Sequence, residues 1–141
     1  MDEKNKKIIE MLREDGRRAF TDIAEELDVS EATVRKRVDK LEKSGVIKNY
    51  TVEVDPSKLG YDTVVLLGLD VDPEYLVEAA EEINRMEEVK STYTCTGDHM
   101  IMAEVWTEDS SHLGELMSNK IAKVEGVKNL CPAIVLEEIK E

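Results

Sequence analysis

The sequence lacks the features that define several broad classes of protein. Its most apolar run, residues 64–69, is far too short to span a bilayer, and no long apolar segment follows the lysines near its start. This excludes a membrane protein and leads us to expect a cytoplasmic one. The two cysteines, Cys95 and Cys131, have no cysteine or histidine at metal-site spacing, so we interpret them as reduced core residues.

Motifs of the common enzyme classes are also missing. The sequence has no glycine-rich phosphate-binding loop, no nucleophile elbow and no cluster of metal ligands at a recognised spacing. The 20 acidic residues that follow residue 50 are scattered along the chain and not paired. We therefore expect no enzyme, with no catalytic residue, no metal and no cofactor.

The charge is distributed very unevenly between the two parts of the chain. The formal net charge is −13, but residues 1–50 hold 12 basic and 12 acidic residues, whereas residues 51–141 hold 7 and 20. Within residues 33–48 there are 6 basic residues and 2 acidic ones, a net charge of +4. A local positive stretch in one part and a strongly acidic second part indicate two domains, of which only the first suits DNA.

Residues 21–47 have the pattern of a helix-turn-helix. A helix is predicted over residues 30–44, with an apolar stripe and basic residues on the rest of its surface. A shorter helix precedes it with Thr21 as the expected N-cap, and residues 28–30 leave room only for a tight turn. Two helices joined in this way cross steeply, so that the second fits the major groove of DNA.

The rest of the chain predicts an α+β protein. An N-terminal helix with Asp2 as its N-cap completes the DNA-binding part, and an apolar strand starting at Val46 gives it the form of a winged helix. After a turn-rich hinge, strand and helix patterns alternate as β-α-β-β-α-β, the ferredoxin-like order. The predicted domains are residues 1–47 for the helix-turn-helix, 48–61 for a hinge with a connecting strand, and 62–141 for the ferredoxin-like domain.

The first strand of the second domain, residues 63–71, has apolar residues at both odd and even positions, and therefore on both of its faces. Both predicted helices cover the same face of an antiparallel sheet, so the other face needs a different cover. A second copy of the same sheet is the simplest cover, which favours a two-fold homodimer. Such a dimer also carries two recognition helices that can meet successive turns of DNA, about 34 Å apart.

Several stretches with this order and spacing resemble the Lrp/AsnC family of feast/famine regulators, over the whole chain and closest to its archaeal members. The stretches that carry the resemblance are residues 6–12, 23–27, 30–42 and 45–47, the hinge at 55–61, the turn at 96–99, and residues 125–127 and 134–136. The resemblance implies a homodimeric transcription regulator that binds double-stranded DNA. It further implies assembly into an octamer of four dimers, often with an amino acid as effector.

Candidate DNA contacts come from the predicted recognition helix. They are Ser30, Glu31, Thr33, Arg35, Lys36, Arg37 and Lys40. Arg37 and Lys36 are the preferred candidates for base or phosphate contact. Glu31 either accepts from a cytosine amino group or favours the helix dipole, and the sequence does not separate these two roles.

Candidate effector contacts follow from the resemblance, which places the ligand near the turn formed by Thr96, Gly97, Asp98 and His99. Backbone amides in a turn suit a carboxylate, and a nearby Asp suits an ammonium group. The alternative is a hairpin turn chosen for its backbone conformation alone. At the level of the whole protein, the alternative is an amino-acid sensor or assembly module with only non-specific DNA binding.

Overall fold

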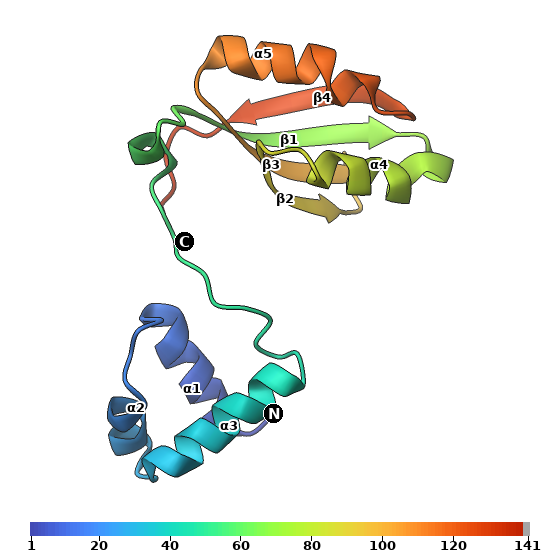
Figure 1. Ribbon diagram of the computed structural model, residues 1–141. Helices are drawn as coiled ribbons and strands as arrows, with labels where there is room; N and C mark the ends of the chain where they lie inside the picture. The colour runs from blue at the N-terminus through green and yellow to red at the C-terminus, as the bar shows by residue number, and fades with distance from the viewer. Residues whose placement is uncertain (140–141) are drawn as a thin grey trace. The chain divides into compact units, whose positions relative to one another are not determined.

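The computed structural model describes residues 1–139, which divide into two compact units. The first unit runs from Met1 to Val54 and the second begins at Asp55 (Figure 1). This division falls inside the predicted hinge. Each unit has its own hydrophobic core, so each is described separately.

The first unit consists of three helices, α1 (Glu3–Glu14), α2 (Phe20–Leu27) and α3 (Glu31–Lys43). Its core is formed by the buried side chains of Ile8, Met11, Ile23, Ala24, Val34, Val38 and Leu41. As predicted, Asp2 is the N-cap of α1, and its side chain accepts a hydrogen bond from the Asn5 N–H at 2.8 Å. Helix α3 agrees with the predicted recognition helix, with Ser30 as its N-cap.

The start of α2 differs from the prediction. The N-cap position is Ala19, which makes no side-chain capping bond, and Thr21 lies inside the helix. The prediction of Thr21 as the cap was wrong because Phe20 packs against the core of the first unit as part of the helix. Burying apolar area there outweighs the roughly 1 kcal/mol that a capping hydroxyl contributes.

The turn between α2 and α3 is tight, as predicted. Asp28 adopts the left-handed conformation with φ 55°, and its N–H donates to the carbonyls of Ala24 and Glu25 at the end of α2. Short polar residues tolerate this conformation better than most non-glycine residues. Asp28 therefore reverses the chain direction before Ser30 starts the recognition helix.

The segment after α3 forms no strand within residues 46–54. Tyr50, Val52 and Val54 are exposed, with Val52 at 78% of its full area. A strand needs hydrogen-bonding partners on a neighbouring strand, and residues 1–139 supply none to this segment. The three helices thus stand without the expected wing strand, and the connecting strand stays a prediction for an assembly of two chains.

The second unit has the predicted β-α-β-β-α-β order, with β1 (Thr63–Val71), α4 (Leu76–Asn84), β2 (Val89–Thr94), β3 (Ile101–Thr107), α5 (Ser110–Asn119) and β4 (Val127–Ile134). The strands form one antiparallel sheet in the order β2-β3-β1-β4 (Figure 1). Short 3-10 turns occupy Pro56–Leu59, Pro73–Tyr75 and Ile121–Lys123. The turn over Pro73–Tyr75 leads directly into α4.

The N-cap of α5 is an aspartate. Asp109, and neither Ser110 nor Ser111, is the N-cap, and its carboxylate accepts the His112 N–H at 2.8 Å. The two serines lie in the first turn of the helix. A carboxylate at this position also interacts favourably with the positive end of the helix dipole, which a hydroxyl does not.

Helices α4 and α5 cover one face of the sheet. Val65, Leu67 and Leu69 of β1 point to that face and are fully buried in a core with residues of both helices. The other face, called here the uncovered sheet face, carries Val64, Leu66, Gly68, Met102 and Trp106. No helix of the described chain packs there, and Leu66 is 44% exposed.

Both cysteines are free, but the expectation that they are core residues was wrong. Cys131 and Cys95 are both exposed. Cys131 lies opposite Gly68 on the uncovered sheet face, and Cys95 follows the last residue of β2. Their apolar sequence neighbours made both look buried because one chain alone does not reveal which face of a sheet stays open.

Candidate nucleic-acid interface and effector loop

Lysines dominate the surface of α3 that points away from its unit. Val34, Val38 and Leu41 bury the opposite side, and a helical period of 3.6 residues places Lys36 and Lys40 on the outward side. Both lysines are exposed, and within residues 1–139 neither has a carboxylate within 4.0 Å. These two predicted residues keep their charge available to an external partner.

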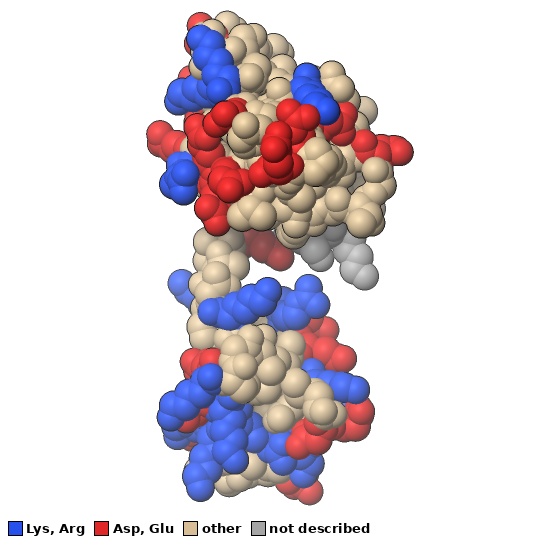
Figure 2. All heavy atoms as spheres, turned by 90° about the vertical axis from the view of Figure 1, so that its right-hand side faces the viewer, with Lys and Arg blue, Asp and Glu red and all other residues tan. Residues whose placement is uncertain are grey.

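Lys43 lies on the same outward side as these lysines but is partly neutralised. Its Nζ is 2.9 Å from Asp39 Oδ2, and this carboxylate raises the pKa of Lys43. The space-filling view shows Lys and Arg side chains gathered on the visible face of the first unit, while Asp and Glu spread over the second (Figure 2). The positive surface is therefore local, as the charge distribution of the sequence predicts.

Arg35 and Glu31 pair with each other. Arg35 Nη2 lies 2.6 Å from Glu31 Oε1, one helical turn earlier, and its guanidinium lies 5.9 Å from the centre of the Phe20 ring. Arg35 therefore lies on the side of α3 that faces α2. The structure thus brings two of the predicted DNA contacts together. The guanidinium group of Arg35 and the carboxylate of Glu31 form an ion pair with each other.

Arg37 lies on the opposite flank of α3 and reaches α1. Its Nη1 donates to Asp2 Oδ2 at 2.7 Å and to Asn5 Oδ1 at 3.0 Å, and its side chain is only 29% exposed. The hydrogen bond from Arg37 is the largest cause that lowers the pKa of Asp2, and the Asn5 N–H adds to it. Arg37, a preferred candidate from the sequence, thus links two helices of its own unit.

Ser30 and Thr33 satisfy each other at the start of α3. Ser30 Oγ accepts the Thr33 N–H at 3.1 Å, and the two hydroxyl groups are 2.9 Å apart. The hydroxyl groups of both residues thus take part in capping the N-terminus of α3. Ala32 lies between them in the sequence, is exposed and carries no charge.

The predicted effector residues lie in a loop between β2 and β3. The Cys95 N–H donates to the Met100 carbonyl at 2.9 Å, which closes a loop of these four residues. Gly97 has φ 111°, a conformation that glycine adopts without strain. Thr96, Gly97 and Asp98 are all exposed.

His99 departs from the other three loop residues and folds back onto the sheet. Its Nδ1 is 3.3 Å from Asp70 Oδ1, and its ring lies directly over Gly68 on the uncovered sheet face. A β-carbon at Gly68 would lie 2.7 Å from His99 Cγ. His99 therefore anchors the loop, whereas Thr96, Gly97 and Asp98 are the part that faces solvent.

Comparison with known families assigns both units. The AsnC-type helix-turn-helix domain matches residues 1–42, and the Lrp/AsnC ligand binding domain matches residues 64–141. The chain belongs to the Lrp/AsnC family. This Lrp/AsnC protein therefore combines a DNA-binding domain with a ligand-binding domain, as a transcription regulator does.

Similar proteins support the same assignment over the full length. The Lrp/AsnC protein is 48% identical to the HTH-type transcriptional regulator LrpA of Pyrococcus horikoshii over 140 residues, 99% of each chain. It is 39% identical to LrpA1 of Halobacterium salinarum, covering 95% of this chain and 94% of that one. Both relatives are named transcriptional regulators.

Solved structures share the fold. The structure of E. coli AsnC has a TM-score of 0.88 and 26% identity, covering 100% of this chain and 95% of that one. The complex of NMB0573 with L-Met from Neisseria meningitidis has a TM-score of 0.90 and 21% identity, covering 100% and 93%. Within residues 1–139 of the Lrp/AsnC protein, no helix has the length and apolarity needed to cross a membrane.

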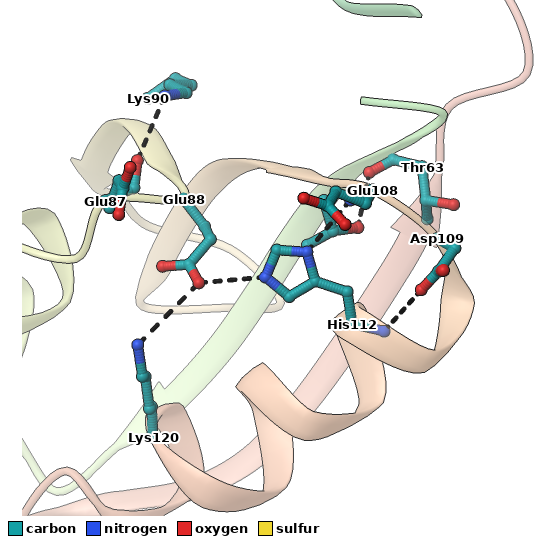
Figure 3. Close-up of polar contacts among 9 residues, drawn as sticks. Thr63, Glu87, Glu88, Lys90, Glu108, Asp109, His112 and Lys120 are labelled. Carbon is teal, nitrogen blue, oxygen red and sulfur yellow. Dashed lines mark hydrogen bonds and ion pairs between the residues drawn. The ribbon is translucent and has the colours of Figure 1, made fainter. Parts of the chain in front are cut away.

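A third polar cluster in the Lrp/AsnC protein joins α5 to the segment before β2 (Figure 3). His112 Nδ1 accepts the Glu108 N–H at 3.1 Å, so the neutral ring carries its proton on Nε2, which faces Glu88 Oε2 at 3.1 Å. Lys120 Nζ is 3.9 Å from the same oxygen. The sequence does not reveal this cluster, because Glu88 and His112 are 24 positions apart.

The environment of Glu88 favours its charged form. Burial raises the pKa of this carboxyl group, but its own backbone N–H, the His112 hydrogen bond and the Lys120 charge together lower it below its usual value. Among the described residues, no group of three His, Cys, Asp or Glu side chains could hold a metal ion. The contacts of the cluster tie α5 to the segment before β2 within the second unit.

Proposed function

We propose that this protein binds specific double-stranded DNA sites by placing α3 in the major groove, with Lys36 and Lys40 contacting phosphates. The observation that carries the proposal is the outward side of α3, where these two lysines are exposed and unpaired within the described chain. Such a regulator acts where the DNA is, in the cytoplasm of a cell without a nucleus.

The other predicted DNA contacts receive different roles in this proposal. Arg35 and Arg37 make contacts within the first unit, so they hold α3 in place. Ser30 and Thr33 shape the start of the helix, and Glu31 balances the charge of Arg35. Phosphate contacts position a protein on DNA without reading the sequence, so specificity must come from other atoms of α3.

Competition binding tests the DNA part of the proposal. Duplexes enriched from a random pool by the full-length protein are compared with shuffled duplexes of the same composition. Lys36→Ala and Lys40→Ala should each weaken binding to both kinds of duplex, whereas Lys123→Ala in the second unit should leave it unchanged. Equal affinity for enriched and shuffled duplexes would favour the alternative, a sensor or assembly module with non-specific DNA binding.

We further propose that an amino acid binds at the loop of Thr96, Gly97 and Asp98. Two observations support this: the second unit matches a ligand-binding domain, and the loop exposes backbone and a carboxylate together. The backbone N–H groups suit the ligand carboxylate and Asp98 suits its ammonium group. His99 has a supporting role, since it fixes the loop to Asp70.

Titration calorimetry with the twenty amino acids tests this site, and L-Met belongs in the panel because a protein of this fold was solved with it. Asp98→Asn should abolish any binding that is found. Asp62→Asn, which also removes an exposed carboxylate from the second unit, should leave it intact. Binding that survives Asp98→Asn unchanged would place the ligand elsewhere.

We also propose that two chains form a homodimer through the uncovered sheet face, and that four dimers form an octamer. The exposed Leu66 in the middle of that face supports the dimer, because an apolar sheet surface left in water favours association. Leu66→Lys should shift the mass measured by light scattering towards the monomer. Val77→Lys, an exposed apolar residue of α4, is the matched control.

A further inference from the structure

The charged side chains that flank the lysines on α3 already have partners within the first unit, at the surface for Arg35 and Glu31 and against α1 for Arg37. Arg35 and Glu31 form an ion pair at 2.6 Å, and Arg37 is held by Asp2 at 2.7 Å. The helix contains no asparagine or glutamine, the residues that pair with adenine. Of the side chains that usually pair with guanine or adenine, the outward side of this helix therefore offers only its lysines, which the proposed function assigns to phosphates.

The N-terminal turn of α3 carries two side chains with methyl groups, Ala32 and Thr33. Ala32 is exposed, and Thr33 is half-buried with its hydroxyl group 2.9 Å from Ser30 Oγ, so the methyl group is the part of the Thr33 side chain that makes no hydrogen bond. Ala32 precedes Lys36 by one helical turn, so both lie on the same side of α3. If Lys36 contacts phosphate, the short side chains of Ala32 and Thr33 let the helix approach the base edges closely.

We propose that Ala32 and Thr33 read thymine through its C5-methyl group. In the major groove, thymine differs from the other bases by this apolar methyl group. The methyl groups of alanine and threonine are usual contacts for it. The inference rests on the proposed insertion of α3 into the major groove. It assigns sequence recognition to two residues without charge and leaves the phosphate contacts to the lysines.

Uracil substitution tests the inference. Deoxyuridine differs from thymidine only by the missing methyl group, so it leaves every base hydrogen bond intact. An enriched duplex is prepared with each thymine replaced in turn, and the affinity of the full-length protein is measured for each. At one or two positions of each half-site the affinity should fall about fourfold, the effect of one buried methyl group, and elsewhere it should not change.

Protein variants identify the reader of each sensitive position. Thr33→Ser deletes only the methyl group and keeps the hydroxyl group that bonds Ser30, and Ala32→Gly deletes the other methyl group. At a sensitive position, the affinity for the thymine duplex is about four times that for the uracil duplex in the wild type. In one of the two variants this ratio should fall to about one. The ratio is measured within one variant, so a general loss of helix stability does not affect it. Thr21→Ser in α2 is the matched control and should keep the full ratio.

Three results are distinguishable. Sensitive positions that lose their sensitivity in Thr33→Ser or Ala32→Gly support the inference. Equal affinity for all uracil-substituted duplexes, with sequence preference retained, overturns it while the proposed function stands. A protein that enriches no sequence at all overturns both.

Discussion

Replacing Gly68 by alanine tests whether the loop before β3 is anchored by close contact between His99 and the sheet. The new β-carbon would lie 2.7 Å from His99 Cγ and 3.0 Å from Nε2. These distances are roughly 1 Å inside the usual contact of carbon atoms. The ring must therefore leave its place over Gly68 and lose its contact with Asp70 Oδ1 at 3.3 Å. Overpacking of this kind costs about 1–3 kcal/mol in free energy of unfolding.

Urea denaturation of the full chain measures the effect. Trp106 is the only tryptophan, and its ring packs beside Tyr61 in the second unit, so its fluorescence follows the unfolding of that unit alone. Gly114→Ala in α5 is the matched control, because a β-carbon there meets nothing within 4 Å. It should stabilise the protein by roughly 0.5–1 kcal/mol through helix propensity.

The His99→Ala background isolates the contact. Once the imidazole ring is gone, Gly68→Ala should cost less than about 1 kcal/mol, because the space that the β-carbon needs is then empty. If Gly68→Ala has the same effect in both backgrounds, or none in the wild type, the close packing of His99 on Gly68 is not what holds the loop.

Two further predictions concern the ion pairs of each unit. Asp2→Asn keeps an N-cap acceptor but removes the anion beside Arg37, so it should lower the thermal stability of the first unit, followed by far-UV circular dichroism, whereas Glu10→Gln at an exposed position inside α1 should not. Since the folded pKa of Asp2 is lowered, its contribution is present above its unfolded pKa of about 3.9 and should be lost as the pH falls through the folded value. Glu88→Gln should destabilise the second unit by about 1–2 kcal/mol at pH 7 because the carboxylate faces His112 and Lys120. The pKa of Glu88 is also lowered in the folded protein, so its contribution to stability is lost as the pH falls. The difference in free energy of unfolding between the wild type and Glu88→Gln should therefore shrink below a pH of about 4.3. A difference that stays constant with pH would contradict this reasoning.

Local rules were enough for much of the fold. The N-cap at Asp2, the tight turn over residues 28–30 and the apolar period of α3 are all properties of short stretches, and they predicted the three helices of the first unit. The strand over residues 63–71 was predicted with its exact bounds. These features depend on neighbours in the sequence, which is why one sequence sufficed.

The roles of individual side chains depend on distant residues and were harder to predict. Arg37 donates a hydrogen bond to Asp2, which lies 35 positions away, and nothing in the recognition helix itself reveals that partner. His99 is held by Asp70, 29 positions away. Cys131 is exposed because it lies on the uncovered sheet face. Residues 46–54 form no strand because no neighbouring strand of the described chain pairs with them.

The salt dependence of DNA binding by charge variants of α3 is the most direct test of the central claim, that Lys36 and Lys40 face DNA while Arg37 does not. Each lost phosphate contact lowers the slope of log affinity against log salt by about 0.9, so Lys36→Ala in a homodimer should lower it by about 1.8. Arg37→Met, checked by circular dichroism to be folded, should leave the slope unchanged. A slope that falls with Arg37→Met and not with Lys36→Ala would contradict the proposed interface.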